Sequence, residues 1–373
     1  MPVLFQLCYN SVANDEEGWM DVMIHTKVWK IDQIKSDWHV QLAQPAALLS
    51  AGKQIAFPTE TVYGLGADAR SEEAVRGIFS AKGRPSDNPL IVHIYDRSQV
   101  HELTNCTNEL ADRLMDQFWP GPLTLILPVR QGVLSNQVTA GLQTVGLRMP
   151  DHPIALELMR QAAVPIAAPS ANTSGRPSPT LASHVLDDLQ GKIEGIVDGG
   201  ATGVGLESTV VEVSGQHIQI LRPGGVTVEH LQACCPEASV TLETELESKE
   251  APRSPGMKYT HYAPQGKLVI VKGESAAVSQ YIVQQVTMHA AENKCGVLCF
   301  EENAHHYEQA DLVLSLGSIN QLEQAASRLY EALRKFDEYG VTRIWSEAST
   351  TEGIGAAFMN RLLKAAGHNV INL

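Results

Sequence analysis

The sequence predicts an α/β protein made of two globular units. The length of 373 residues exceeds that of one typical domain, and 44% of the residues are hydrophobic, which is enough for two cores. Strand-like runs alternate with amphipathic helices up to about residue 236, where the composition changes before a simpler alternation begins. Residues 1–22 show no periodicity, so we expect a disordered extension there.

The first unit, residues 23–236, combines two kinds of strand connection. Helices are predicted at 71–80, 108–118 and 154–162. Strands are predicted at 54–57, 90–95, 123–128, 145–149, 166–168 and 195–198. Two more strands, 209–213 and 217–221, flank Ser214-Gly215-Gln216, which is a hairpin signal. Because hairpins give antiparallel neighbours and helical crossovers give parallel ones, we expect a twisted mixed sheet flanked by helices.

A linker and a candidate lid follow at residues 237–265. Residues 237–254 are rich in Glu, Ser, Thr and Pro, which is typical of a solvated linker. Residues 254–264 are bounded by prolines and are too polar for a core and too aromatic for a spacer. This segment could be an ordered interdomain strap, or a lid that closes over a pocket of the first unit and excludes water.

The second unit, residues 266–373, has the pattern of a small doubly wound, Rossmann-like domain. Strands are predicted at 267–271, 296–300, 312–316 and 343–345, and helices at 275–291, 321–338 and 355–366. Its first strand is not followed by Gly-x-Gly-x-x-Gly, so the sequence predicts no dinucleotide site there.

Composition excludes several classes of function. No apolar run of about 18 residues is present, so no membrane span is predicted, and the acidic start is unlike a secretory signal. The six cysteines lack metal-ligand spacing and are expected to be reduced core thiols of a cytoplasmic protein. The net charge of −14 disfavours stable unaided binding to long nucleic acids and favours a small anionic ligand in a focused pocket.

Two short polar segments are the strongest sign of such a pocket. Lys82-Gly83-Arg84-Pro85 and Ser170-Ala171-Asn172 each follow an apolar run and are fenced by Pro and Gly, so their side chains should lie on stiff turns. Arg148 and Arg222 also end strand-like runs beside Pro and Gly. Any one of these arginines could simply be solvated, but together with Lys82 they predict a ligand with more than one anionic group.

Five motifs, in order along the chain, resemble those of the YrdC family. They lie at residues 57–66, 82–85 together with 88–93, 119–124, 170–175 and 207–210. The segment 254–264 and the trailing α/β domain resemble the longer, two-domain form of that family. The resemblance implies a YrdC-like domain with L-threonylcarbamoyladenylate synthase activity. Such an enzyme condenses L-threonine, bicarbonate and ATP to threonylcarbamoyl-AMP and diphosphate, for N6-threonylcarbamoyladenosine modification of tRNA.

The resemblance also implies two sets of ligand-binding residues. The expected ATP-binding residues are Lys82, Arg84, Asn88, Thr144, Ser170, Asn172, Ser178, Arg222 and Tyr262. The expected L-threonine-binding residues are Thr61, His93, Arg148, Ala168 and Ser208. From the residues alone, His93 could equally be a satisfied core histidine. No Gly-x4-Gly-Lys-Ser/Thr loop is present, so side-chain cations and hydroxyls would have to hold the nucleotide.

Further expectations concern cofactors and partners. Mg²⁺ is expected to arrive with ATP, without a protein ligand, and no tightly bound organic cofactor is expected. Glu60 and Glu207, the acidic residues inside the motifs, could bind Mg²⁺ through water or orient arginines. The product implies a downstream threonylcarbamoyl transferase complex.

Two other functions compete with the synthase. One is an RNA-binding YrdC-like module, which the acidic charge disfavours. The other is a carbamoyltransferase-type maturation factor, whose zinc-finger-like cysteine clusters and acylphosphatase-like segment are not found in this sequence.

Overall fold

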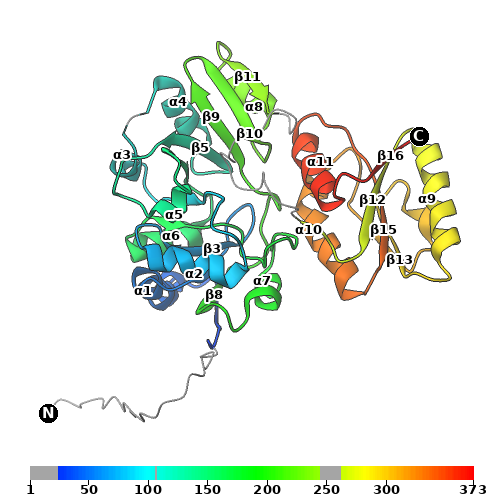
Figure 1. Ribbon diagram of the computed structural model, residues 1–373, viewed down its shortest axis with the longest axis horizontal. Helices are drawn as coiled ribbons and strands as arrows, with labels where there is room; N and C mark the ends of the chain where they lie inside the picture. The colour runs from blue at the N-terminus through cyan, green and yellow to red at the C-terminus, as the bar shows by residue number, and fades with distance from the viewer. Residues whose placement is uncertain (1–23, 106, 244–261) are drawn as a thin grey trace, which may run out of the picture.

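The computed structural model describes residues 24–105, 107–243 and 262–373, which form two α/β domains (Figure 1). The predicted extension at residues 1–22 and most of the predicted lid, up to His261, lie outside the described residues.

The first domain contains a large mixed sheet of eleven strands within the described residues. In order across the sheet they are β1 (Lys27–Lys30), β8 (Gly195–Asp198), β2 (Ile55–Phe57), β3 (Gly64–Asp68), β7 (Ile166–Ala167), β4 (Ile91–His93), β6 (Thr144–Arg148), β5 (Leu123–Pro128), β9 (Thr209–Ser214), β10 (His217–Arg222) and β11 (Ser239–Leu242). β4 and β6 are parallel, whereas β9 and β10 form the predicted antiparallel hairpin. The prediction of a mixed sheet is therefore confirmed.

Helices cover both faces of this sheet, as the alternation of strand side chains requires. In β2, Ala56 packs into one core, while Ile55 and Phe57 pack into another. The first core receives side chains from α2 (Glu72–Lys82), α4 (Glu109–Phe118), α7 (Ala182–Leu189) and α8 (Val228–Cys234). The second receives them from α1 (Ala43–Ser50) and α6 (Pro153–Ala162). The shorter helices are α3 (Ser98–Leu103) and α5 (Asn136–Thr139).

The prediction that the linker begins at residue 237 is wrong. Residues 239–242 form the edge strand β11, which pairs in parallel with β10 from His217↔Ser239 to Ile220↔Leu242. This segment is mostly exposed, so its composition resembles that of a linker, but its backbone completes the sheet edge.

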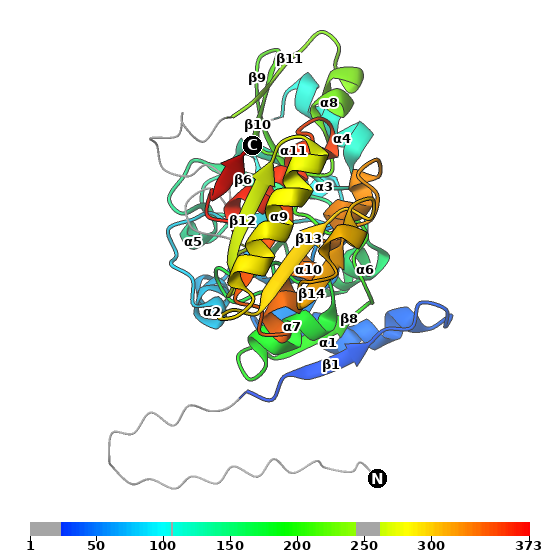
Figure 2. The ribbon, with the colours of Figure 1, turned by 90° about the vertical axis from the view of Figure 1, so that its right-hand side faces the viewer.

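The second domain is a parallel sheet in the order β14 (Leu312–Ser315), β13 (Cys295–Cys299), β15 (Arg343–Glu347), β12 (Lys267–Lys272) and β16 (Val370–Asn372). Helix α9 (Ser275–His289) covers the outer face, as Figure 2 shows. Helices α10 (Leu322–Glu338) and α11 (Ile354–Ala365) lie between the sheet and the first domain (Figure 1). Helices on both faces confirm the doubly wound prediction.

One hydrophobic core crosses the boundary between the domains. Val62 and Leu206 of the first domain belong to the same buried cluster as Leu329 of α10 and Phe358 of α11. The two domains are thus packed against each other rather than joined only by a tether. Among the described helices, none is both long and apolar enough to span a bilayer.

Candidate active site

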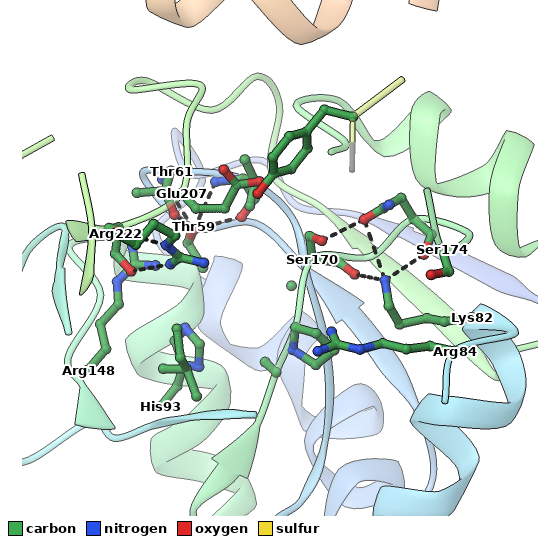
Figure 3. Close-up of a pocket in the computed structure, with 18 of the residues that line it drawn as sticks. Thr59, Thr61, Lys82, Arg84, His93, Arg148, Ser170, Ser174, Glu207 and Arg222 are labelled. Atoms are coloured by element: carbon green, nitrogen blue, oxygen red, sulfur yellow. Dashed lines mark hydrogen bonds between the residues drawn. The ribbon is translucent and has the colours of Figure 1, made fainter. Parts of the chain in front are cut away.

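A pocket in the first domain, beside the second, brings together most of the predicted site residues (Figure 3). Its lining is Thr59, Thr61, Val62, Gly64, Lys82, Arg84, Ile91, His93, Arg148, Ala168, Pro169, Ser170, Asn172, Ser174, Gly175, Glu207, Ser208, Arg222 and Tyr262. All five residues expected to bind threonine are in this list, together with six of the nine expected to bind ATP.

The two polar segments meet at Lys82. Helix α2 begins with the Ser71 side chain accepting a hydrogen bond from the backbone of Ala74 and ends at Gly83, whose φ of 61° is left-handed. Lys82, in the last turn, donates to the carbonyl oxygens of Ser170 at 2.5 Å and Asn172 at 2.6 Å. The Lys82 ammonium therefore fastens one wall of the pocket to the other.

Burial sets the character of this lysine. Lys82 is only 2% exposed, and burial together with the nearby charge of Arg84 lowers its pKa well below the usual value. With its donors directed at carbonyl groups, Lys82 holds the Ser170–Asn172 turn in place, which is a positioning role beside the predicted contact with ATP. Ser170 adds a hydrogen bond from its hydroxyl to the Asn172 side chain at 2.6 Å.

Three residues expected to bind ATP lie outside the pocket lining. Asn88 is fully buried, and its backbone carbonyl oxygen accepts a hydrogen bond from the Arg84 guanidinium at 3.5 Å. Thr144 begins β6 and pairs with Pro128 of β5. Ser178 is fully buried and donates to Glu207 at 2.5 Å, so in this structure its hydroxyl serves a carboxylate. Sequence motifs place these residues near the site but do not show which way a side chain points.

Adjacent strands position the residues expected to bind threonine. His93 of β4 is directly opposite Arg148 of β6 in the parallel register, and Ala168 follows β7 and donates from its backbone to Ile91 at 3.0 Å. The Arg148 guanidinium lies 2.6 Å from a carboxylate oxygen of Glu60. Three neighbouring strands thus direct an imidazole, a guanidinium and a backbone turn to one place (Figure 3).

His93 is held neutral. It is 4% exposed, and burial together with the charge of Arg148 lowers its pKa to about 3. Its Nδ1 is buried and has no hydrogen-bond partner. An unpaired ring nitrogen in a pocket is a costly arrangement unless a ligand completes it, which favours a binding role over a satisfied core histidine.

Hydroxyl groups line the pocket between these cations. The hydroxyls of Thr59 and Thr61 lie 2.9 Å apart, and Ser208 bonds to Thr124 at 2.8 Å. Arg222, at the end of β10, donates to the carbonyl oxygen of Ser208 at 3.0 Å and to its hydroxyl at 3.1 Å. Burial and the nearby Arg361 lower the pKa of Arg222 to about 10, so it stays charged near neutral pH.

The second domain reaches the pocket through Glu207. The carboxylate of Glu207 accepts from Arg361 of α11 at 2.8 Å and from the hydroxyl of Tyr330 of α10 at 2.9 Å. Burial alone would raise the pKa of Glu207, but Arg361 and Arg222 outweigh it and lower the pKa to about 2. Reasoning from the sequence missed Arg361 and Tyr330, because nothing in a helix pattern shows which distant loop it covers.

Tyr262 is the described end of the predicted lid. It lines the pocket with 6% exposure, its ring lies 5.1 Å from that of Tyr330, and the Arg361 guanidinium is 5.9 Å from its centre. Its φ of 68° is left-handed, which is uncommon for a bulky residue and is seen where the surroundings fix the chain. Ala263 anchors the turn by donating to Gly175 at 3.0 Å.

Both carboxylates of the pocket lie against arginines. Glu60 is paired with Arg148, and Glu207 with Arg361 and Tyr330. In the part of the chain that the structure describes, no group of three or more His, Cys, Asp or Glu side chains could hold a metal. Of the two roles that the sequence left open for these glutamates, orienting arginines agrees with the geometry.

The fold and the site together define a two-domain α/β protein with a pocket of arginine, lysine and hydroxyl side chains suited to small anionic ligands. Comparison with known proteins is more specific. The family model described as "Telomere recombination" matches residues 47–224, and that described as "Threonylcarbamoyl-AMP synthase, C-terminal domain" matches residues 226–367. This chain belongs to the threonylcarbamoyl-AMP synthase family.

Relatives and a solved structure cover nearly all of the chain. A threonylcarbamoyl-AMP synthase of Bacillus subtilis is 52% identical, the match covering 93% of this chain and 99% of the relative. One of Pyrococcus abyssi is 44% identical over 90% of this chain and 96% of the relative. The crystal structure of P. abyssi Sua5 complexed with L-threonine superposes with a TM-score of 0.86 and 42% identity, covering 93% of this chain and all of that one. A shorter relative of Pseudomonas syringae with the same name is 36% identical over 51% of this chain and 99% of its own length.

Proposed function

We propose that this chain is a threonylcarbamoyl-AMP synthase that condenses L-threonine, bicarbonate and ATP to threonylcarbamoyl-AMP and diphosphate, releasing water. One observation carries the proposal most directly. All five residues expected to bind threonine line one pocket, in a chain that is 52% identical over almost its whole length to a relative bearing that name.

The threonine end of the pocket fits an amino acid. A guanidinium such as that of Arg148 suits a carboxylate, and the hydroxyls of Thr61 and Ser208 can address a small polar ligand. Neutral His93 can accept or donate a hydrogen bond without adding charge. Since Glu60 already lies against Arg148, a bound carboxylate would share or displace that contact.

The nucleotide end contains the remaining cations. Arg84 and Arg222 face the pocket from opposite sides, with Ser170, whose backbone oxygen is bound by Lys82, between them (Figure 3). We assign ATP to this end, with Mg²⁺ bound to its phosphates. The chemistry then needs two steps: the threonine amine takes up bicarbonate with loss of water to give a carbamate, and an oxygen of that carbamate attacks the α-phosphorus, so that diphosphate leaves. Close approach and charge neutralisation are what this pocket offers that step.

Purified protein incubated with ATP, bicarbonate and L-threonine tests the proposal. We expect diphosphate release that requires all three, together with a product of the mass of threonylcarbamoyl-AMP. Reactions lacking threonine, or containing L-alanine in its place, are the controls. Diphosphate that forms equally well without threonine contradicts the synthase assignment.

The proposed place of this reaction is the cytoplasm, before a threonylcarbamoyl transferase complex that transfers the group to tRNA. The net charge of −14 supports transfer through a diffusing intermediate rather than a stable complex of this chain with tRNA. A gel shift with tRNA at physiological salt should show no retained complex, whereas tight, salt-sensitive binding would favour the RNA-binding alternative.

A further inference from the structure

Two buried ion pairs connect the second domain to the first, and each ends beside a different part of the pocket. Arg361 of α11 contacts Glu207, next to Ser208 at the threonine end. Arg334 of α10 contacts Asp188 of α7, beneath the loop that carries Asn172 and Ser174 at the nucleotide end. We propose that Arg361 and Arg334 are separate positioning residues: Arg361 acts where the threonine end and the nucleotide end meet, and Arg334 acts on the nucleotide end alone.

The Arg361 contact is built to hold a carboxylate firmly. Arg361 is fully buried, donates to the side chain of Glu207 at 2.8 Å and to its backbone oxygen at 3.4 Å. Tyr330 and Ser178 complete the acceptor sites of that carboxylate at 2.9 Å and 2.5 Å. Four hydrogen bonds from three other segments fix Glu207, and with it the peptide that leads into Ser208.

Arg361 also controls where Arg222 points. Glu207 is close enough to both arginines for each to lower the pKa of its carboxyl group. In the structure Arg361 takes the direct contact with Glu207, while Arg222 donates to Ser208. Without the Arg361 guanidinium, the buried Glu207 carboxylate would need another cation, and Arg222 is the nearest candidate. Because Arg222 is an expected ATP-binding residue and also donates to Ser208, its movement would disturb the nucleotide end and the threonine end together.

The Arg334 contact supports the opposite wall. Arg334 is 2% exposed and donates to both carboxylate oxygens of Asp188, at 3.1 and 2.9 Å, and to the carbonyl of Pro177 at 2.5 Å. Asp188 in turn accepts from the backbone of Thr173 at 3.1 Å. Thr173 lies between Asn172 and Ser174, both of which line the nucleotide end. The contacts from Arg334 through Asp188 to Thr173 therefore fix the position of that loop relative to the pocket.

This inference rests on the proposed function and gives the second domain a specific part in it. The Pseudomonas syringae relative matches only half of this chain, so such a domain is not a general requirement for bearing the name of the enzyme. In this chain, however, Glu207 and Asp188 are buried against arginines of the second domain. Without that domain Glu207 would lose its direct contact with an arginine, whereas Asp188 would lose Arg334 and keep its ion pair with Arg176 of the first domain.

The test compares Arg361→Gln and Arg334→Gln by steady-state kinetics in full-length protein. We expect Arg361→Gln to raise KM for L-threonine and KM for ATP, each at least about tenfold, and Arg334→Gln to raise KM for ATP at least about tenfold with KM for L-threonine within about twofold. Lys335→Gln is the matched control, since Lys335 adjoins Arg334 but makes an exposed pair with Glu331. It should leave both KM values unchanged.

A milder variant keeps the test decisive if Arg361→Gln fails to fold. Tyr330→Phe removes one hydroxyl from Glu207 and retains the ring, so it should fold and raise both KM values about threefold. Equal changes in both KM values of Arg334→Gln, or unchanged KM values in folded Arg361→Gln and Tyr330→Phe, would overturn the inference. Calorimetric titrations with L-threonine and with ATP give the same comparison without turnover. An inactive wild-type enzyme that still shows the split in binding refutes only the proposed function.

Discussion

The side-chain nitrogen of Lys82 lies 2.6 Å from the backbone oxygen of Asn172, which joins two motifs that are 90 positions apart in the sequence. This contact makes Lys82 part of the framework of the pocket. Lys82 should therefore contribute to stability as well as to activity, whereas Arg84, two residues further along the same turn, should contribute mainly to activity.

Replacing Lys82 with Met should therefore destabilise the protein as well as inactivate it. Loss of the buried donor leaves the oxygens of Ser170 and Asn172 unpaired, at a cost of about 2–4 kcal/mol. Urea unfolding measures this change. Lys335→Met, at an exposed position on α10, is the control and should alter the unfolding free energy by less than about 0.5 kcal/mol.

Arg84→Ala should have the opposite profile. Arg84 follows the end of α2 and is half-buried, not exposed as a turn residue would suggest, yet it packs beside the pocket rather than in a core. We expect turnover to fall at least about a hundredfold and the unfolding free energy to change by less than about 1 kcal/mol. Arg76→Ala, on the exposed face of α2, is the matched control. An unfolded Arg84→Ala protein would show instead that Arg84 is structural.

Arg148→Lys should weaken threonine binding selectively. A lysine can keep the charge contact with Glu60 but cannot grip a carboxylate through two parallel donors. We expect KM for L-threonine to rise about thirtyfold, with KM for ATP nearly unchanged. Arg160→Lys, at an exposed pair with Glu157, should have no effect on either value. A normal threonine KM in Arg148→Lys would remove Arg148 from the threonine site.

Acid should begin to destabilise the protein at a pH well above the range in which carboxylates usually titrate. Burial, followed by a nearby arginine, lowers the pKa of His93 to about 3 and that of His184 to about 4, against 6.5 in an unfolded chain. The unfolded state then binds more protons below pH 6.5, so stability is full above that pH and falls as the pH drops toward 4.

Thermal unfolding between pH 7 and 5 measures this loss, which should reach about 2 kcal/mol for each histidine at pH 5. His93→Gln should flatten the dependence, whereas His101→Gln, at an exposed position, should leave it as in the wild type. A wild-type unfolding midpoint that is constant from pH 7 to 5 contradicts the neutral, buried state of His93.

Removing residues 254–373 should leave a folded first domain without synthase activity. The large sheet and the cores on its two faces remain, but Val62 and Leu206 lose their apolar neighbours, and Glu207 loses Arg361. Far-ultraviolet circular dichroism and threonine-dependent diphosphate release measure the two properties. Kinetics like those of the full-length protein would show that neither the lid nor the second domain takes part.

The sequence by itself determined the two α/β domains, the mixed and parallel sheets, and most of the residues that line one pocket. These features depend on local periodicity, on Pro and Gly turns and on short motifs, which are written in neighbouring residues. They sufficed to predict that Lys82-Gly83-Arg84 and Ser170-Ala171-Asn172 share a site. Periodicity failed at β11, because pairing with a sheet edge is decided by the neighbouring strand and not by composition.

Only the tertiary structure decided which of these side chains face one another. Asn88 and Ser178 are buried outside the pocket lining, and Lys82 donates its hydrogen bonds to backbone oxygens. Arg361 donates to Glu207, which lies 154 positions away in the sequence. A buried charge needs an opposite charge or oxygen atoms within a few ångströms, and packing of the two domains chooses which residue supplies them. That choice is invisible in either segment alone.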